Sequence, residues 1–264
     1  MEFYLDFNGN TFIDILYKYS SINQNLFSSL INNELWFSNP FDFNDPYDCN
    51  LNYDFSDINY EKIYNHLVQS DKKFNWGLTD EFVKNRAKNI YNNPNEIYEL
   101  TKDFLKSTIN NRGITCFSES DTILLMWSHY ADSHKGVCLT FDVEKDRDFF
   151  SIPYKVNYPI DYPKIDPFSN NDGKEVQLVL ATKSKEWAYE KEVRIVKEKD
   201  YCPKFRGAVE FKPETLTEIK FGYKASLEQI RTVRNLVDKK YPHVKLYTSK
   251  IKHSEFGIEF SPIN

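Results

Sequence analysis

GITCFSESDTILLMWSHYADSHKGVCLTFD, residues 113–142, contains the clearest succession of secondary-structure elements in the chain. Its first part, Gly113 to Ser118, is rich in branched and aromatic residues and predicts a β-strand. Glu119-Ser120-Asp121 is typical of a helix start, so a short helix is expected from Thr122 to Ala131. Gly136 to Asp142 predicts another strand, which completes a strand–helix–strand unit.

Upstream of this unit, the sequence predicts two strands, a helix between them and a longer helical block. Phe12 to Tyr19 and Glu34 to Ser38 have the composition of strands, and Ser20-Ser21 is placed to cap the intervening helix. From about residue 58 to residue 106, apolar side chains recur at three- and four-residue steps, which predicts helices. Asn93-Pro94 should divide this block, because a proline disfavours helical geometry in the residue before it.

Downstream of the unit, strands predominate. Predicted strands cover Tyr154 to Tyr158, Val193 to Lys197 and Val209 to Phe211, and a helix from about Gly173 to Ser184 separates the first two. A β-α-β segment at about 219–248 follows, with strands at Ile219–Gly222 and Lys245–Tyr247 and a helix from Ser226 to Lys239. Because strands are grouped and helices are segregated, the sequence predicts an α+β fold. We expect one domain over residues 1–264, with a mixed or antiparallel central sheet and a helical insertion at about 58–106.

The composition favours a well-packed core in a reducing compartment. Aromatic residues make up 16% of the chain, which supplies large burial areas and argues against disorder. The net charge of -5 argues against a wide cationic surface that follows phosphates. The four cysteines form no CxxC pair, so reduced thiols are expected rather than a zinc knuckle. Without an apolar run of about 18 residues or a signal-like N-terminus, we expect a cytoplasmic protein with no membrane partner.

The loop from Phe43 to Asp48 is the first of three candidate sites. Asp45 and Asp48 could bind a metal ion or a ribose hydroxyl. In the structural alternative, Asn44 and Asp45 bond their own backbone and so fix the turn.

The second candidate site combines Cys116 to Ser120 with the predicted helix that carries Met126 to Tyr130. His129 could border a cleft as a proton carrier or ligand partner. A hydrogen-bonded, half-buried histidine is the structural alternative. Neither an HExxH pattern nor a GxSxG pattern occurs, so a zincin or an α/β-hydrolase is not supported.

The third candidate site is Trp187 to Val196. Glu190 and Glu192 lie two residues apart at the expected start of a strand, so both carboxylates should project to one face, with Arg194 following them. Two neighbouring carboxylates can have separated pKa values and serve as acid, base or stabiliser of a cation. The structural alternative is a solvated strand face with weak ion pairs.

Taken together, the motifs resemble the DUF2971 family, a bacterial family of unknown function, from about Leu16 to Val196. The resemblance implies no established reaction and associates the chain with phage defence. The segments that carry it are Leu16–Tyr19, Leu35–Pro40, Phe43–Asp48, Cys116–Ser118, Met126–Asp132, His134–Val137 and Trp187–Arg194.

The chain also resembles the layout of ADP-ribosyltransferase-like proteins, which have a basic residue on a first strand, a Ser-x-Ser strand end and a final ExE strand. Here those positions are Lys18, Ser118 with Ser120, and Glu190 with Glu192, although Arg or His is more usual than lysine at the first. The resemblance implies that NAD is the substrate. The residues expected to bind it are Lys18, Tyr19, Asn44, Asp45, Ser118 and Tyr130.

Within this layout, Glu192 is expected to be the principal catalytic carboxylate, and Glu190 to orient an acceptor or a ribose hydroxyl. His129 is the third expected catalytic residue, and Arg194 should hold Glu192 ionised. Glycosidic cleavage builds positive charge that a fixed carboxylate can stabilise. The sequence therefore predicts an ADP-ribosyltransferase-like or NAD-cleaving enzyme, in a defence or toxin role. Its expected partners are a small-molecule nucleotide and a protein or nucleic-acid acceptor.

Two other function classes stay open at the level of sequence. A metal-dependent nuclease or phosphodiesterase could use Asp45, Asp48, His129 and Glu190, because carboxylates suit Mg²⁺ or Mn²⁺, although no ligand spacing singles out a metal site. In a non-catalytic sensor or interaction module, the same polar clusters would bind a ligand without turnover.

Overall fold

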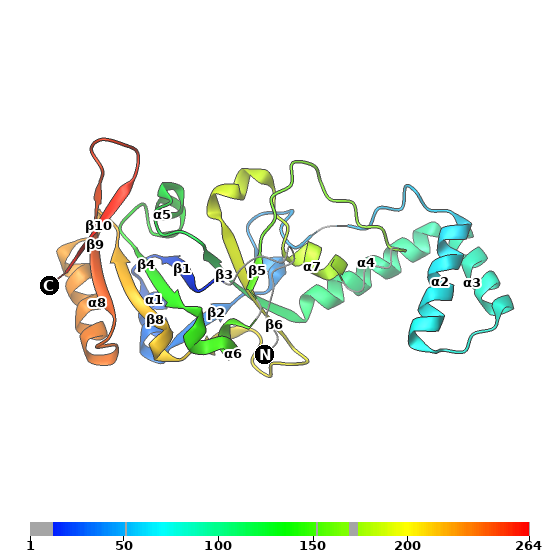
Figure 1. The fold of residues 1–264 in the computed structure, drawn as a ribbon, viewed down its shortest axis with the longest axis horizontal. Helices are drawn as coiled ribbons and strands as arrows, with labels where there is room; N and C mark the ends of the chain where they lie inside the picture. Colours follow the sequence, from blue (N-terminus) through cyan, green and yellow to red (C-terminus); the bar gives the residue numbers. More distant parts are fainter. Residues whose placement is uncertain (1–12, 51, 152, 169–173, 264) are drawn as a thin grey trace.

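The computed structural model describes residues 13–50, 52–151, 153–168 and 174–263. Figure 1 shows an elongated α+β molecule, with a large sheet at one end and a helical arm at the other. The sheet has eight strands in the order β10-β9-β8-β4-β1-β3-β6-β5. The strands are β1 (Ile15–Ser20), β3 (Arg112–Ser118), β4 (Val137–Asp142), β5 (Pro153–Lys155), β6 (Glu192–Glu198), β8 (Leu216–Phe221), β9 (Lys245–Ile251) and β10 (Ile258–Pro262).

The sheet is mixed, as the sequence predicts. All neighbouring strands are antiparallel except β8 and β9, which are parallel and are joined by helix α8 (Leu227–Lys240). A parallel pair needs such a crossover because a short turn cannot bring the chain back to the same end. Ser226 begins α8 with a capping box shared with Gln229. The β-α-β prediction is therefore confirmed.

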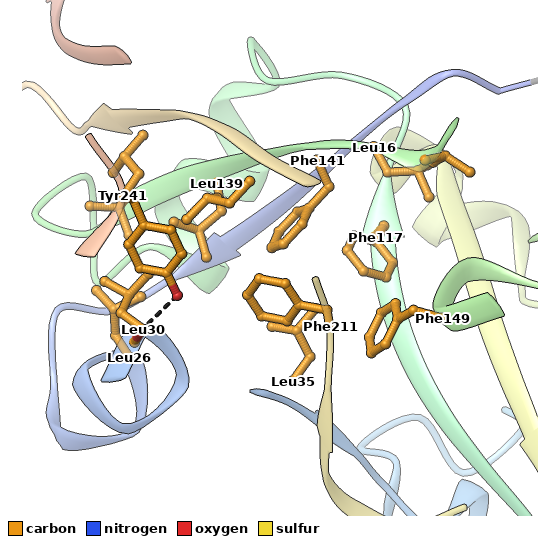
Figure 2. Close-up of a cluster of buried hydrophobic side chains, with 14 of the residues drawn as sticks. Leu16, Leu26, Leu30, Leu35, Phe117, Leu139, Phe141, Phe149, Phe211 and Tyr241 are labelled. Carbon is orange, nitrogen blue, oxygen red and sulfur yellow. Dashed lines mark hydrogen bonds between the residues drawn. The ribbon is translucent and has the colours of Figure 1, made fainter. Parts of the chain in front are cut away.

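The first face of the sheet is covered by an aromatic-rich core. Figure 2 shows Phe141 and Phe117 from β4 and β3 facing Phe149 and Phe211, with Leu26 and Leu30 of α1 (Gln24–Asn32) nearby. The two-stranded sheet of β2 (Glu34–Phe37) and β7 (Gly207–Glu210), helix α6 (Arg147–Phe150) and α8 complete this layer. The Tyr241 hydroxyl, at the end of α8, donates to the Leu30 carbonyl at 2.7 Å, so the two helices are joined by a buried hydrogen bond as well as by packing.

The opposite face of the sheet carries two smaller apolar clusters. Trp127 of α5 (Leu124–Tyr130) packs edge-on against Tyr19 of β1. Farther along the sheet, α4 (Pro94–Asn110) and α7 (Lys174–Leu180) pack on Ile114 and Val196. Because both faces are covered, β4 and β6 are almost continuously buried along their lengths.

The predicted helical insertion is present as α2 (Tyr60–Phe74), α3 (Asp80–Asn92) and α4, which together form the arm in Figure 1. Pro94 is the first residue of α4, where its missing N–H costs nothing, so the expected division at Asn93-Pro94 is confirmed. The remaining short elements are 3₁₀ helices η1 (Pro40–Asp42), η2 (Val143–Asp146), η3 (Lys185–Glu190) and η4 (Pro213–Thr215). Among the described residues, no helix has the length and apolar character needed to cross a membrane.

Some sequence-based boundaries are wrong. Ser20 still belongs to β1, where it pairs with Val137, and the cap of α1 is Asn23, whose side chain accepts from the Leu26 amide. Helix α7 ends at Leu180 rather than at Ser184. The expected strand start at Phe12 lies outside the described residues. Strand β10 was not predicted, because its short alternating sequence becomes a strand only by pairing with β9.

Candidate functional site

The candidate site is built around Arg194, whose side chain is completely buried on β6. Its Nη1 and Nη2 lie 2.8 Å from Oδ1 and Oδ2 of Asp48. Its Nε and Nη2 lie 2.8 and 3.1 Å from Oε1 and Oε2 of Glu192. Nη1 also donates to the Leu180 carbonyl at 2.8 Å. A planar guanidinium suits two carboxylates at once, and this geometry makes Arg194 the centre of the cluster.

Lys183 joins a third carboxylate to this centre. Its Nζ lies 2.6 Å from Glu190 Oε2, 3.4 Å from Glu192 Oε2 and 3.8 Å from Asp48 Oδ2. We call Asp48, Lys183, Glu190, Glu192 and Arg194 the buried charge network; three carboxylates there face two cations. Mutual pairing is what makes burial of so many charges tolerable.

A turn, rather than a strand, brings Glu190 next to Glu192. Glu190 is the last residue of η3, Lys191 adopts a left-handed conformation with φ 45°, and β6 begins only at Glu192. The Ser118 hydroxyl fixes this turn by donating to the Glu190 carbonyl at 2.7 Å. The expectation that both glutamates lie on a strand is therefore wrong, and so is the alternative of a solvated strand face. The two carboxylates nevertheless meet at Lys183.

The two glutamates differ in acidity. Burial alone would raise the pKa of Glu192, but the charge and hydrogen bonds of Arg194, with the charge of Lys183, lower that pKa to about 2. Burial raises the pKa of Glu190, and its bonds to Lys183 and Tyr130 offset this only in part. Glu192 is thus held ionised, as expected from its pairing with Arg194, whereas Glu190 takes up a proton more readily than an ordinary glutamate.

Aromatic residues of α5 and η3 lie on the outer side of Glu190. The Tyr130 hydroxyl donates to Glu190 Oε1 at 2.6 Å. His129 is exposed, and its ring centroid lies 6.2 Å from that of Tyr189 and 6.5 Å from that of Tyr130. Trp187 lies below the Lys183 ammonium, 4.6 Å from the ring centroid. His129 therefore neighbours the network without touching its carboxylates through any contact that the structure describes.

Lys18 lies on the other face of the sheet. Strand pairing places Tyr17 opposite Ser118 and Ser118 opposite Glu192, so these three residues share a face. Lys18 projects the other way and donates to Thr115 Oγ1 at 3.0 Å and the Cys116 carbonyl at 2.9 Å. Lys18 and the buried charge network therefore do not form one surface, although the three expected strands are adjacent.

Of the other predicted NAD-binding residues, Ser118 and Tyr130 donate hydrogen bonds to Glu190, whereas Tyr19, Asn44 and Asp45 are separate from the buried charge network. Tyr19 is buried and its hydroxyl donates to the Ser120 carbonyl at 2.8 Å. Asn44 is exposed. Asp45 is buried, and its Oδ1 accepts from the Tyr47 amide at 2.9 Å, as the turn-fixing alternative predicted. Asp45 Oδ2 is buried without a hydrogen-bond partner. From this loop, Asp48 pairs with Arg194, and the Phe43 ring centroid lies 5.3 Å from the Arg194 guanidinium.

The carboxylates of the network are oriented toward cations of the protein. Among the described residues, no group of three or more His, Cys, Asp or Glu side chains is arranged to hold a metal ion. Asp48 and Glu190 already share the Lys183 ammonium, and His129 lies on the exposed side. The residues proposed as metal ligands thus do not converge on a common vacant centre.

Several members of the site could not be recognised from the sequence. Lys183 was assigned to a helix that in fact ends at Leu180, and no spacing links it to the glutamates. Cys49 Sγ lies 3.3 Å from Arg194 Nη1, and the Tyr158 hydroxyl accepts from the Glu192 amide at 2.8 Å. Both contacts join segments far apart in the chain.

Comparison with known proteins supports the family resemblance over part of the chain. A sequence model of a family described as "Protein of unknown function (DUF2971)" matches residues 126–195. This segment includes Tyr130 and, apart from Asp48, every member of the buried charge network. No curated protein and no solved structure matches the chain. The comparisons therefore assign no reaction.

Proposed function

We propose that the chain cleaves NAD at the bond between nicotinamide and ribose, as a glycohydrolase or an ADP-ribosyltransferase. The observation that carries the proposal is the pair of glutamates with opposite pKa shifts, of which Glu192 lies on the face of the sheet shared with Ser118. Pairs of carboxyl groups whose surroundings separate their pKa values are typical of sites that need one ionised group and one protonatable group.

In this proposal, Glu192 is the principal carboxylate. As the C–N bond breaks, its electron pair leaves with nicotinamide, and the ribose becomes cationic. An ionised Glu192 stabilises that charge, because Arg194 and Lys183 keep the carboxylate unprotonated. Water or another acceptor then attacks the ribose, and its proton passes to a base, for which Glu190 with its higher pKa is suited.

Substrate access sets a condition on the proposal. Glu190 is 2% exposed and Glu192 is 4% exposed, so NAD reaches them only if the segment that covers them moves. The Lys183 ammonium contacts both glutamates and lies over the Trp187 ring of η3, and the exposed His129 lies beside the half-buried Tyr130 and Tyr189. Opening η3 would expose aromatic rings and carboxylates together.

Nicotinamide release from NAD by the purified chain tests the proposal. Glu192→Gln should lower turnover by roughly 10²-fold or more, as loss of a preorganised electrostatic group does. Glu198→Gln, the same change at the far end of β6, is the matched control and should retain activity. Rates are referred to folded protein, measured by circular dichroism. No release by the wild type, with protein and nucleic-acid acceptors present, would reject the enzyme assignment.

A non-catalytic ligand-binding module is the second candidate. It is favoured by the pairing of both oxygens of Glu192 and of Asp48 with Arg194, which leaves them little capacity for a reaction. NAD or another nucleotide that raises the melting temperature without product formation would support this alternative.

The metal-dependent nuclease and the toxin or defence role stay predictions. Nuclease activity that EDTA abolishes would support the nuclease. Growth arrest on expression, relieved by Glu192→Gln, would support the toxin role.

A further inference from the structure

The end of the helical arm presents two large aromatic side chains to solvent. Phe74, the last residue of α2, and Trp76, in the turn that follows, are 56% and 55% exposed. Their rings stack on one another, with centroids 5.2 Å apart and planes 20° from parallel. Exposed aromatic pairs of this kind are costly in water and commonly mark an interaction surface.

The turn holds this aromatic pair in a fixed position. The Asp71 carbonyl accepts from the Trp76 amide at 3.3 Å, and the Asp71 carboxylate accepts from the Leu78 amide at 3.0 Å. Asn75 and Gly77 take left-handed conformations, with φ 51° and 71°, which make the reversal tight. The rings are thus presented on an ordered turn, which lowers the entropy cost of binding.

The surroundings of the aromatic pair are positively charged, although the whole chain has a net charge of -5. Residues 71–88 contain five basic and three acidic side chains. Two of the acidic groups are engaged locally: Asp71 by the Leu78 amide, and Asp80 by Tyr64 at 2.7 Å and Lys84 at 2.8 Å. The local excess of positive charge suits a polyanion.

One basic side chain lies against the aromatic pair, and other basic side chains near it in the sequence are exposed. Lys73 lies 5.4 Å from the centroid of the Phe74 ring, and Lys72 is exposed in the same helical turn. Across the turn, Phe82 and Arg86 are both exposed and share one face of α3. We call Lys72, Lys73, Phe74, Trp76, Phe82 and Arg86 the arm tip.

We propose that the arm tip binds single-stranded nucleic acid, with bases stacked on Trp76 and Phe74 and phosphates near Lys72 and Arg86. Stacking on an aromatic platform together with cations along the backbone is the usual mode of sequence-tolerant single-strand binding. A near-parallel pair of rings extends a base stack, and the small size of the charged area fits a few nucleotides rather than a duplex. This inference is independent of NAD cleavage.

Fluorescence anisotropy of a fluorescein-labelled oligothymidylate tests the proposal at 50 and 150 mM NaCl, a range in which phosphate contacts weaken with salt. The full-length chain should bind more weakly at the higher salt concentration. Trp76→Ala should lower the affinity by roughly 5-fold or more. Lys72→Gln combined with Arg86→Gln should lower the affinity and flatten the salt dependence.

Trp36→Ala is the matched control, because Trp36 is 65% exposed but lies on β2, away from the arm. It should bind the oligonucleotide like the wild type. Thermal melting verifies that each variant is folded. The proposal is overturned by any of three results: no oligonucleotide binding at 50 mM NaCl, equal losses for the two tryptophan variants, or binding to anionic phosphatidylserine vesicles with none to the oligonucleotide. Because NAD is absent from this assay, its result does not depend on the enzyme assignment.

Discussion

Replacing Arg194 with methionine removes the centre of the buried charge network and approximately keeps the side-chain volume. The change leaves the carboxylates of Asp48 and Glu192 buried without their guanidinium partner. The nearest remaining cation is the Lys183 ammonium, which lies 3.8 Å from Asp48 and 3.4 Å from Glu192. Removing one partner of a buried ion pair costs about 3–5 kcal/mol. Because whole proteins are stable by only about 5–15 kcal/mol, this is a large part of the total. At about 2–4 °C per kcal/mol, the melting temperature should fall by roughly 6–20 °C.

Urea unfolding followed by circular dichroism at pH 7 measures this loss. Arg147→Met is the matched control, because Arg147 forms an exposed ion pair with Glu144. Such surface pairs contribute about 0–1 kcal/mol. Adding Asp48→Asn to Arg194→Met should recover part of the stability, because the double variant no longer buries the unpaired Asp48 carboxylate. A loss below about 1 kcal/mol for Arg194→Met, or no recovery in the double variant, would contradict the inferred energetics of the network.

Measuring stability as a function of pH should show how much the ionised Glu192 stabilises the fold. Because folding lowers the pKa of Glu192 from 4.5 to about 2, this stabilisation is complete above about pH 5 and is lost as the pH falls toward 2. The free energy of unfolding, measured by urea titration at each pH, should therefore depend on pH differently in the wild type and in Glu192→Gln, by about 3 kcal/mol in total over that range. The same pH dependence in both proteins would refute the lowered pKa of Glu192. Tyr130→Phe removes a 2.6 Å hydrogen bond that lowers the pKa of Glu190, so that pKa should rise further in carbon-13 NMR titrations, at a cost of about 1 kcal/mol in stability. Gly113→Ala would place Cβ 1.8 Å from the Phe205 carbonyl oxygen, so it should lower stability by about 1–3 kcal/mol or more, and a melting temperature like that of the wild type would show that the backbone there can yield.

The fold class could be predicted because it depends on local signals. Strands such as Val137–Asp142 consist mainly of apolar and branched residues, and the arm helices show helical periodicity broken by Pro94. What failed depended on pairing between distant segments. The sequence at Ser20 resembles a helix cap, but Ser20 is the last residue of β1 and pairs with Val137 of β4. The sequence Ile258–Pro262 becomes β10 only because β9 lies beside it. The single-domain organisation stays a prediction.

The candidate site divides in the same way. Glu192 and Arg194 lie two residues apart on one strand, so their contact and its effect on acidity could be predicted. Asp48 and Lys183 reach Arg194 from other segments, and nothing in their local sequence indicates this. The side of the sheet on which Lys18 lies could not be predicted, for a different reason. A lysine is expected on a polar face, yet its ammonium is satisfied on the core side by Thr115 and a backbone carbonyl.

Because the buried charge network joins three separate segments, it forms only when the domain is assembled, and each of its members supports both the fold and the proposed site. Loss of activity in Glu192→Gln is therefore informative only per folded molecule. Tyr130→Phe separates the two roles better, because Tyr130 touches only Glu190 of the network, at its outer side, and leaves the pairs of Arg194 intact. If Glu190 exchanges a proton during NAD cleavage, this variant should shift the pH dependence of nicotinamide release upward, in the direction of the raised pKa of Glu190. If the network only stabilises the fold, the variant should lower the melting temperature slightly and leave that pH dependence unchanged.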